Sequence, residues 1–157
     1  MQALYIGLTL IGISVYSILK SRKTVQPLDR AKLYLKKDKT SEAIKALNEA
    51  VELDDKQYEA YKLLGDVYYQ IKSFDKALTA YNKAIKNHKE PIAYFNRGIT
   101  YVSLNQLDQA IKDVTTCMNT YKGDKNFIYK ELGYLYQMIG DQNQSKNYYN
   151  MVMKTSA

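Results

Sequence analysis

A unit of about 34 residues occurs four times along this chain, and it constrains the fold more than any other feature of the sequence. Gly65, Gly98 and Gly133 are 33 and 35 residues apart, and Ala31 holds the equivalent position 34 residues before Gly65. The residues three positions after these four are Tyr34, Tyr68, Tyr101 and Tyr136. The residues twelve positions after them are Ala43, Ala77, Ala110 and Ser145. A period in this range is typical of stacked helical hairpins, in which neighbouring units bury one another's apolar faces.

The apolar periodicity within the units predicts a chain of helices without strands. The expected helices span residues 27–37, 41–53, 57–71, 74–87, 91–104, 107–121, 125–139 and 142–154. Pro27 and Pro91 are suited to the first turn of a helix, and Gly140 is suited to the left-handed position that ends one. The residues expected to cap the second helix of each pair are Thr40, Ser73, Asn105 and Asp141.

Residue types at the matched positions resemble those of the tetratricopeptide repeat (TPR). In the second unit the matching residues are Tyr61, Leu64, Gly65, Tyr68, Ala77, Tyr81 and Ala84. The third unit supplies Tyr94, Gly98, Tyr101, Ala110, Val114 and Cys117, and the fourth supplies Tyr129, Leu132, Gly133, Tyr136, Ser145, Tyr149 and Val152. The first unit is the most divergent, with Pro27, Ala31, Tyr34, Ala43, Leu47 and Ala50.

This resemblance implies an all-α, TPR-like solenoid of about four helical hairpins. The repeats are expected at about residues 24–57, 58–90, 91–125 and 126–157, within a repeat domain of residues 27–157. Small residues such as Gly65 and Ala77 let the two helices of a unit approach closely, and aromatic residues fill the wider gaps beside them. The tyrosine and alanine positions are therefore expected to be structural.

The resemblance also implies a binding surface, because similar proteins use the inner face of the first helix of each pair as a concave groove for peptides. The candidate peptide-groove residues are Lys62, Asp66, Tyr69, Ile92, Phe95, Asn96, Ile99, Phe127, Lys130 and Tyr134. Those of the third unit are more apolar than an exposed surface requires. Either an apolar groove for a peptide or helix, or burial by a tight superhelix or a contact between chains, explains that composition.

A carboxylate clamp, which in some similar proteins holds the C-terminal carboxylate of chaperone tails, is not expected. Lys62 and Asn96 match that clamp, but Asp66 replaces an asparagine, and Phe127 and Glu131 replace two basic residues. Acidic groups at these positions would repel a bound carboxylate.

Residues 2–19 carry no charged side chain and predict a transmembrane anchor at residues 1–20, followed by a basic linker at 21–26. Eighteen helical residues extend about 27 Å, enough to cross the core of a bilayer. Tyr5 and Tyr16 lie near its ends, where interfacial aromatic residues are favoured. A cleaved signal peptide would need a basic segment before the apolar stretch and a small-residue cleavage site. A buried core helix would usually keep a polar stripe.

Most of the net charge of +7 lies just after this stretch: residues 20–45 hold nine Lys and Arg against three Asp and Glu. Because Lys20, Arg22 and Lys23 directly follow the predicted span, the positive-inside rule places the repeat domain in the cytosol. The basic region is expected to face anionic lipid head groups. Nucleic acid is not an expected partner, because no aromatic platform for bases accompanies the lysines.

No catalytic, cofactor or metal site is expected. His88 is the only histidine and ends a predicted helix, where a cation is favoured. Cys117 is the only cysteine and occupies a small-residue packing position. Asp54 and Asp55 lie at a junction between units and are expected to be solvated.

Two functions fit these features. The first is a membrane-anchored adaptor whose cytosolic repeats recruit a protein or peptide partner. The alternative is a structural subunit of a larger membrane-associated complex or homo-oligomer. Tyr148, Met151 and Val152 offer an apolar side of the last helix for self-association. The sequence does not identify the partner.

Overall fold

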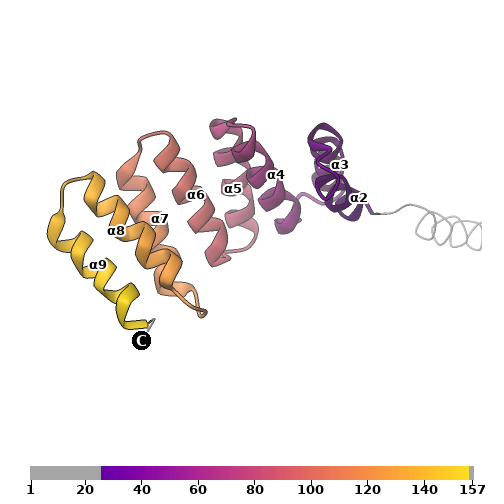
Figure 1. Cartoon of the computed structure of the whole chain (residues 1–157). Helices are drawn as coiled ribbons and strands as arrows, with labels where there is room; N and C mark the ends of the chain where they lie inside the picture. Colours follow the sequence, from indigo (N-terminus) through magenta and orange to yellow (C-terminus); the bar gives the residue numbers. More distant parts are fainter. Residues whose placement is uncertain (1–25, 156–157) are drawn as a thin grey trace, which may run out of the picture.

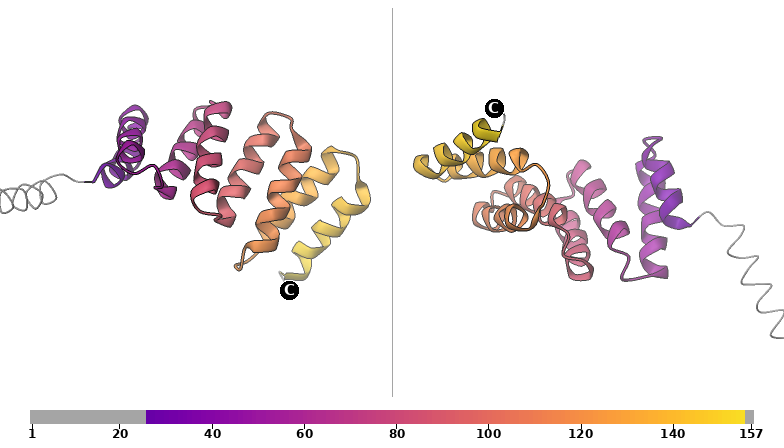
Figure 2. Two further views of the ribbon diagram at one scale, coloured as in Figure 1. Left: turned by 180° about the vertical axis from the view of Figure 1, so that it is seen from behind. Right: turned by 90° about the horizontal axis from the view of Figure 1, so that it is seen from below.

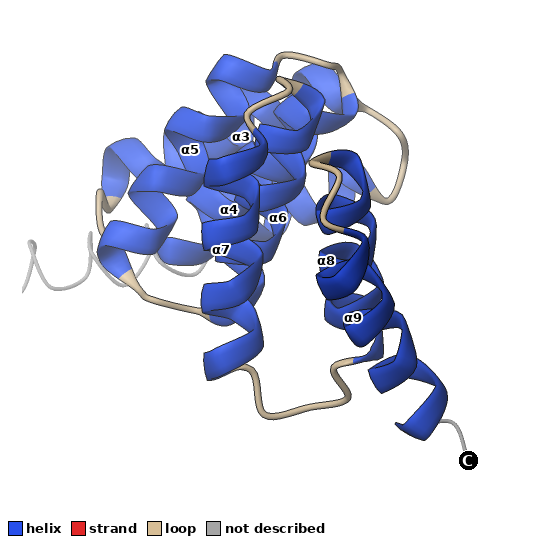
Figure 3. Cartoon of the chain, turned by 90° about the vertical axis from the view of Figure 1, so that its left-hand side faces the viewer, coloured by secondary structure: helices blue, strands red, loops and turns tan. Residues whose placement is uncertain are grey.

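A computed structural model describes residues 26–155, and in this part of the chain all regular secondary structure is helical (Figure 3). The helices are α2 (Pro27–Leu35), α3 (Thr40–Leu53), α4 (Tyr58–Gln70), α5 (Phe74–Asn87), α6 (Pro91–Ser103), α7 (Leu107–Thr120), α8 (Asn126–Met138) and α9 (Gln142–Thr155). They follow one another in chain order along a curved array, with α2 and α9 at opposite ends (Figures 1 and 2). The eight expected helices are confirmed, with ends within two residues of the predicted positions.

The predicted anchor at residues 1–20 lies outside the described residues, as does most of the linker at 21–26. Among the helices from residue 26 to residue 155, none combines the length and the apolar character needed to span a bilayer.

Each hairpin turns through the same backbone motif. The residue after the turn donates its N–H to the carbonyl of Tyr34, Tyr68, Tyr101 or Tyr136, at 2.8–2.9 Å in every repeat. The residue before that donor has a positive φ, and these four residues are Asp38, Lys72, Asn105 and Gly140. This hydrogen-bond pattern satisfies carbonyls that a helix end leaves free. The repeated tyrosine therefore also marks the last turn of the first helix.

The turn motif corrects three of the four expected helix caps. Asn105 has a φ of 56° and ends α6, so it does not cap α7. Thr40 is the first residue of α3, and Ser73 precedes α5 without a side-chain capping bond. Only Asp141 caps as predicted: its Oδ1 accepts the backbone N–H of Gln144 at 3.0 Å. Gly140, with a φ of 86°, takes the predicted left-handed position.

In three hairpins a glycine of the first helix lies directly against a larger residue sixteen positions later in the second helix. These pairs are Gly65 and Tyr81, Gly98 and Val114, and Gly133 and Tyr149. The equivalent positions of the first hairpin hold Ala31 and Leu47, both fully buried. A Cβ atom on Gly65 would lie 2.4 Å from Cε1 of Tyr81, which is closer than atoms can pack. The corresponding distances are 2.8 Å from Gly98 to Val114 and 2.9 Å from Gly133 to Tyr149. The glycines are therefore required by the size of the residue opposite them.

The apolar interior forms two clusters, one in α2–α5 and one built mainly from α6–α9, with a polar link between them. Arg97 on α6 donates to both carboxylate oxygens of Asp113 on α7, at 2.6 and 2.7 Å, and to Asn82 Oδ1 on α5 at 2.6 Å. Its guanidinium also lies over the rings of Tyr94 and Tyr101. The Asp113 side chain is only 6% exposed, so this ion pair is largely desolvated.

Because the Tyr81 ring fits against Gly65, we expect the effects of substitutions at these two positions on stability to be strongly coupled. Gly65→Ala should lower the free energy of unfolding by about 1–3 kcal/mol, because the added methyl group collides with the Tyr81 ring. In a Tyr81→Leu background the same change should cost less than about 1 kcal/mol, because the first repeat already holds Ala31 and Leu47 at the equivalent positions. Urea denaturation of the four variants measures the coupling.

Gly140→Ala is the control for this double-mutant cycle. Its cost in unfolding free energy comes from the φ of 86° at residue 140 and should not depend on residue 81. Equal costs of Gly65→Ala in the two backgrounds would contradict the proposed fit.

Candidate functional site

Five of the candidate groove residues surround a single pocket of about 450 Å³ between α4 and α6. Asp66 and Tyr69 come from α4, and Phe95, Asn96 and Ile99 come from α6. The sequence analysis missed the other two lining residues, which are Gln70 and Tyr81. The glycine opposite Tyr81 was the available signal, because it shows that the tyrosine side chain crosses between the two helices.

The Asp66 carboxylate is the centre of the polar wall of this pocket. Its Oδ1 accepts the Tyr81 hydroxyl at 2.7 Å and the Asn96 side-chain amide at 2.9 Å. Its Oδ2 accepts the Lys62 ammonium at 2.8 Å. The donors come from α4, α5 and α6, so one carboxylate joins three helices of two repeats. Burial, followed by the nearby Asp66 charge, raises the pKa of Tyr81 well above its usual value.

This network accounts for the two residues that match a carboxylate clamp. Lys62 and Asn96 both donate to Asp66, so the chain's own carboxylate holds the groups that would bind a ligand carboxylate. On α8, Glu131 is half-buried, and burial raises the pKa of its carboxyl group. Glu131 is therefore a second acidic side chain at a position where the clamp requires a basic residue.

An aromatic patch adjoins the pocket. The Phe95 ring packs edge-to-face on Phe127 at the start of α8, with 4.9 Å between the ring centroids. Tyr121, which follows α7, packs on the same Phe127 ring at 5.5 Å and was not anticipated from the sequence. Phe127 nevertheless remains 37% exposed, and Tyr134 on α8 is 47% exposed. Neighbouring repeats thus cover part of the apolar inner surface and leave part of it open.

The remaining candidates do not line the pocket. Ile92 is half-buried near the start of α6, and Lys130 is exposed on α8. Together with Phe127 and Tyr134 they extend the candidate surface along the two later repeats.

Other reactive groups have packing roles in the structure. The His88 ring lies 5.3 Å from the Tyr58 ring at the end of α5. Cys117 is fully buried, and burial raises the pKa of its thiol to about 11, so it stays protonated at neutral pH. Within residues 26–155, no three His, Cys, Asp or Glu side chains come together in a way that could hold a metal ion. The side chains that line the pocket offer apolar contact and hydrogen bonding.

Comparison with known proteins agrees with this architecture. The family model described as "Tetratricopeptide repeat" matches residues 28–90 and 73–114. Heat shock protein STI1 of Saccharomyces cerevisiae is 27% identical over 99 residues, which cover 62% of this chain and 17% of that protein. Hsp70-Hsp90 organizing protein 2 of Arabidopsis thaliana is 27% identical over 146 residues, covering 80% of this chain and 26% of that protein. This chain thus corresponds to a small part of each relative.

Solved structures share the fold over most of the chain. A crystal structure of MamA superposes with a TM-score of 0.80 at 24% identity, covering 90% of this chain and 84% of that chain. A second MamA crystal structure gives a TM-score of 0.76 at 26% identity, covering 82% and 70%.

The buried Tyr81 hydroxyl predicts a loss of stability at alkaline pH. The pKa of this group is raised on folding, so its contribution is complete below pH 10, its ordinary pKa, and declines as pH rises further. Between pH 8 and pH 11 the free energy of unfolding of Tyr81→Phe should fall by about 1.4 kcal/mol less than that of the wild type. Urea denaturation at both pH values measures this difference.

Tyr134→Phe removes an exposed hydroxyl and serves as the matched control, which should lose as much stability as the wild type. The same loss in Tyr81→Phe as in the wild type would contradict the buried position of this hydroxyl beside Asp66.

Proposed function

Because the chain belongs to the tetratricopeptide repeat family, we propose that it is a non-enzymatic scaffold that binds a protein or peptide segment in its concave groove. The supporting observation is the pocket between α4 and α6, which shares Phe95 with the exposed aromatic patch on α8. Open apolar surface next to oriented polar groups is typical of peptide-binding grooves. The names of two relatives, an "organizing protein" and a heat shock protein, agree with a scaffold role.

The proposed ligand is an internal segment or a helix with apolar side chains. Asp66 accepts hydrogen bonds from Lys62, Tyr81 and Asn96 and therefore lies directly beside the two donors that match a carboxylate clamp. A ligand ending in a free carboxylate would be repelled by the Asp66 charge at this position. Phe95, Ile99 and Phe127 instead offer apolar contacts that involve no such repulsion.

We also propose that residues 1–20 anchor the chain in a membrane with the repeats in the cytosol. The support is the uncharged stretch at residues 2–19 and the bases that follow it. Part of the basic region is used internally, since Arg30 pairs with Glu49 and Lys32 pairs with Glu59. Lys36 and Lys37 are exposed at the end of α2 and are available to anionic head groups.

A second candidate function is that of a structural subunit, which the end of the array favours. On α9, Met151 is 43% exposed and Met153 is 64% exposed. Tyr148, which the sequence suggested for self-association, stacks on Tyr136 of α8 with 5.5 Å between ring centroids. It therefore contributes to the last hairpin, and a contact between copies would use the methionines. Size measurement in mild detergent distinguishes a stable assembly from a monomer.

Substitutions in the groove test the scaffold function. A photocrosslinking amino acid at Tyr134, at the exposed edge of the groove, should capture the partner in cells. Adding Phe95→Ala and Ile99→Ser should weaken that capture by about 30-fold or more, because apolar anchors of a groove contribute roughly 2 kcal/mol or more.

Leu53→Ser is the matched control, since Leu53 is 75% exposed at the end of α3, away from the groove residues. Circular dichroism confirms that each variant is folded. Unchanged capture by a folded double variant would show that the groove is not the binding surface.

The basic residues that follow the proposed anchor also predict on which side of the membrane the repeats lie. Protease added outside intact cells should leave the repeat domain uncut, and permeabilisation should expose it. Reversing Lys20, Arg22 and Lys23 to glutamate should place a detectable fraction of the repeats outside, because positive residues next to a span favour the cytosolic side. Digestion of the wild-type repeats in intact cells would contradict the proposed orientation.

A further inference from the structure

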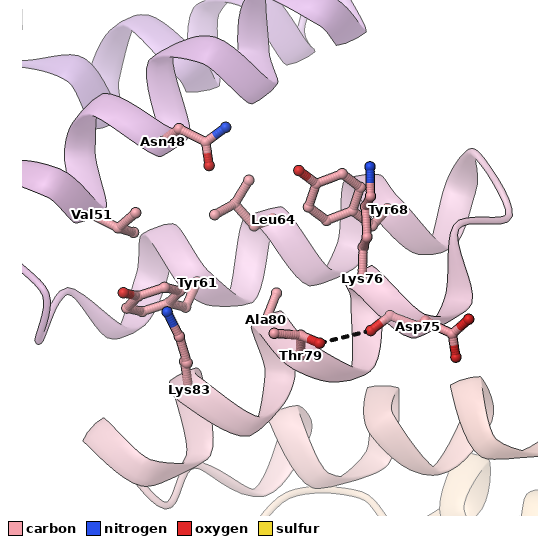
Figure 4. Close-up of a pocket in the computed structure, with 10 residues that line it drawn as sticks. All are labelled: Asn48, Val51, Tyr61, Leu64, Tyr68, Asp75, Lys76, Thr79, Ala80 and Lys83. Atoms are coloured by element: carbon pink, nitrogen blue, oxygen red, sulfur yellow. Dashed lines mark hydrogen bonds between the residues drawn. The ribbon is translucent and has the colours of Figure 1, made fainter.

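A second pocket lies on another side of α4, between α3, α4 and α5 (Figure 4). From α4 it uses Tyr61, Leu64 and Tyr68, whereas the groove uses Asp66, Tyr69 and Gln70 of the same helix. At 3.6 residues per turn these two sets project from nearly opposite sides of α4. The second pocket is therefore separate from the groove.

Its centre is apolar, and a tyrosine with a lysine lies at each end, with Asp75 beside one of the lysines. Leu64 and Ala80 lie between two pairs, Tyr61 with Lys83 at one end and Tyr68 with Lys76 at the other (Figure 4). The Lys83 ammonium is 5.3 Å from the centroid of the Tyr61 ring, and the Lys76 ammonium is 5.6 Å from that of Tyr68. Contact with the ring faces holds both cations at the edges of the apolar centre.

In the part of the chain that the structure describes, neither ammonium group is neutralised by a carboxylate. Among the described residues, Lys76 and Lys83 take part in no ion pair. The lining contains one acidic residue, Asp75, against these two lysines. The lining therefore carries a net positive charge, with Lys83 at one end and Lys76 beside Asp75 at the other. Its central residues Leu64 and Ala80 are only 4% and 5% exposed, so the apolar floor is narrow. A ligand with two separated carboxylates and a few apolar groups between them is complementary to this arrangement.

The spacing of the lysines determines the shape of that ligand. They are seven residues apart on α5, which is two helical turns or about 10.5 Å. An extended peptide covers this distance in about three residues, which places its two end side chains on opposite faces. A helix covers it in seven residues, with both side chains on one face. We propose that this pocket binds an acidic amphipathic helix of a partner protein, with carboxylates seven residues apart and leucine-sized side chains between them.

The arrangement also lowers the cost of binding. A lysine side chain loses rotamer freedom when it is fixed in a complex. Here the tyrosine rings already restrict both lysines, and the ammonium N–H groups remain available for hydrogen bonds to carboxylates. A chain with both surfaces occupied would bridge two partners, one on each side of α4.

A designed helical peptide provides the test, with the full-length chain held in a lipid nanodisc. The peptide has two glutamates seven residues apart, two leucines between them, and a fluorophore for anisotropy measurements. Binding is expected, and Lys76→Glu with Lys83→Glu should weaken it by about tenfold or more, because two attractive contacts become repulsive. A peptide with lysines in place of the glutamates should bind the reversed variant better than the wild type.

The matched control is Lys86→Glu with Lys112→Glu, which changes the net charge equally at two exposed lysines outside the pocket. Its affinity should stay within about twofold of the wild type. A control peptide with the glutamates five residues apart, on different faces, should bind less tightly.

Three results would overturn the proposal. They are no binding of the designed peptide, equal weakening by the two pairs of reversals, and equal affinity for the two peptides. In a further measurement, anionic or neutral lipid vesicles are added to the bound peptide. Displacement by the anionic vesicles but not by the neutral ones, to the same extent from the wild type and the control variant, would instead assign the lysines to a membrane surface.

Discussion

Each repeat depends on one close approach between its two helices, and in the second repeat that contact also shapes the pocket between α4 and α6. The Tyr81 ring lies where a side chain on Gly65 would have to be. Its hydroxyl continues past the glycine and donates to Asp66 at the pocket. One tyrosine therefore closes the core on one side and orients the polar wall of the groove on the other. A substitution there is expected to change both the packing of the hairpin and the shape of the pocket.

The four repeats solve this packing problem with different pairs of residues. Ala31 and Leu47 hold the equivalent positions in the first repeat and Gly98 faces Val114, whereas Gly65 and Gly133 face tyrosines. Of these four larger residues, the two tyrosines carry a hydroxyl beyond the contact. Within residues 26–155, Tyr81 of the second repeat is the one whose hydroxyl donates to a carboxylate, that of Asp66. The polar part of the groove is accordingly found between the second and third repeats, and the aromatic part lies between the third and fourth.

The positions of the helices could be predicted from the sequence because the residues that start and end a helix act locally. Pro27, Pro91 and Gly140 act where their backbone restrictions or freedom predict. Asn105 was misassigned because a residue between two helices can end the first or cap the second, and its φ decides which. The candidate groove residues of α4 and α6 came from the resemblance to the tetratricopeptide repeat, in which the inner face of the first helices lines a groove. The Asp66 network and the contact of Tyr121 with Phe127 were not predicted, because they depend on how neighbouring repeats are placed in space.

The central claim is that the repeated residues hold the scaffold together while the irregular residues of the inner face bind the partner. A substitution scan of residues 26–155 that measures both cellular abundance and photocrosslinking to the partner tests this most directly. Changes at Gly65, Ala77 and Val114 should lower abundance, and changes at Phe127 and Lys130 should lower crosslinking at unchanged abundance. The claim would be contradicted if crosslinking followed abundance at every position, with no group of inner-face residues that affects binding alone.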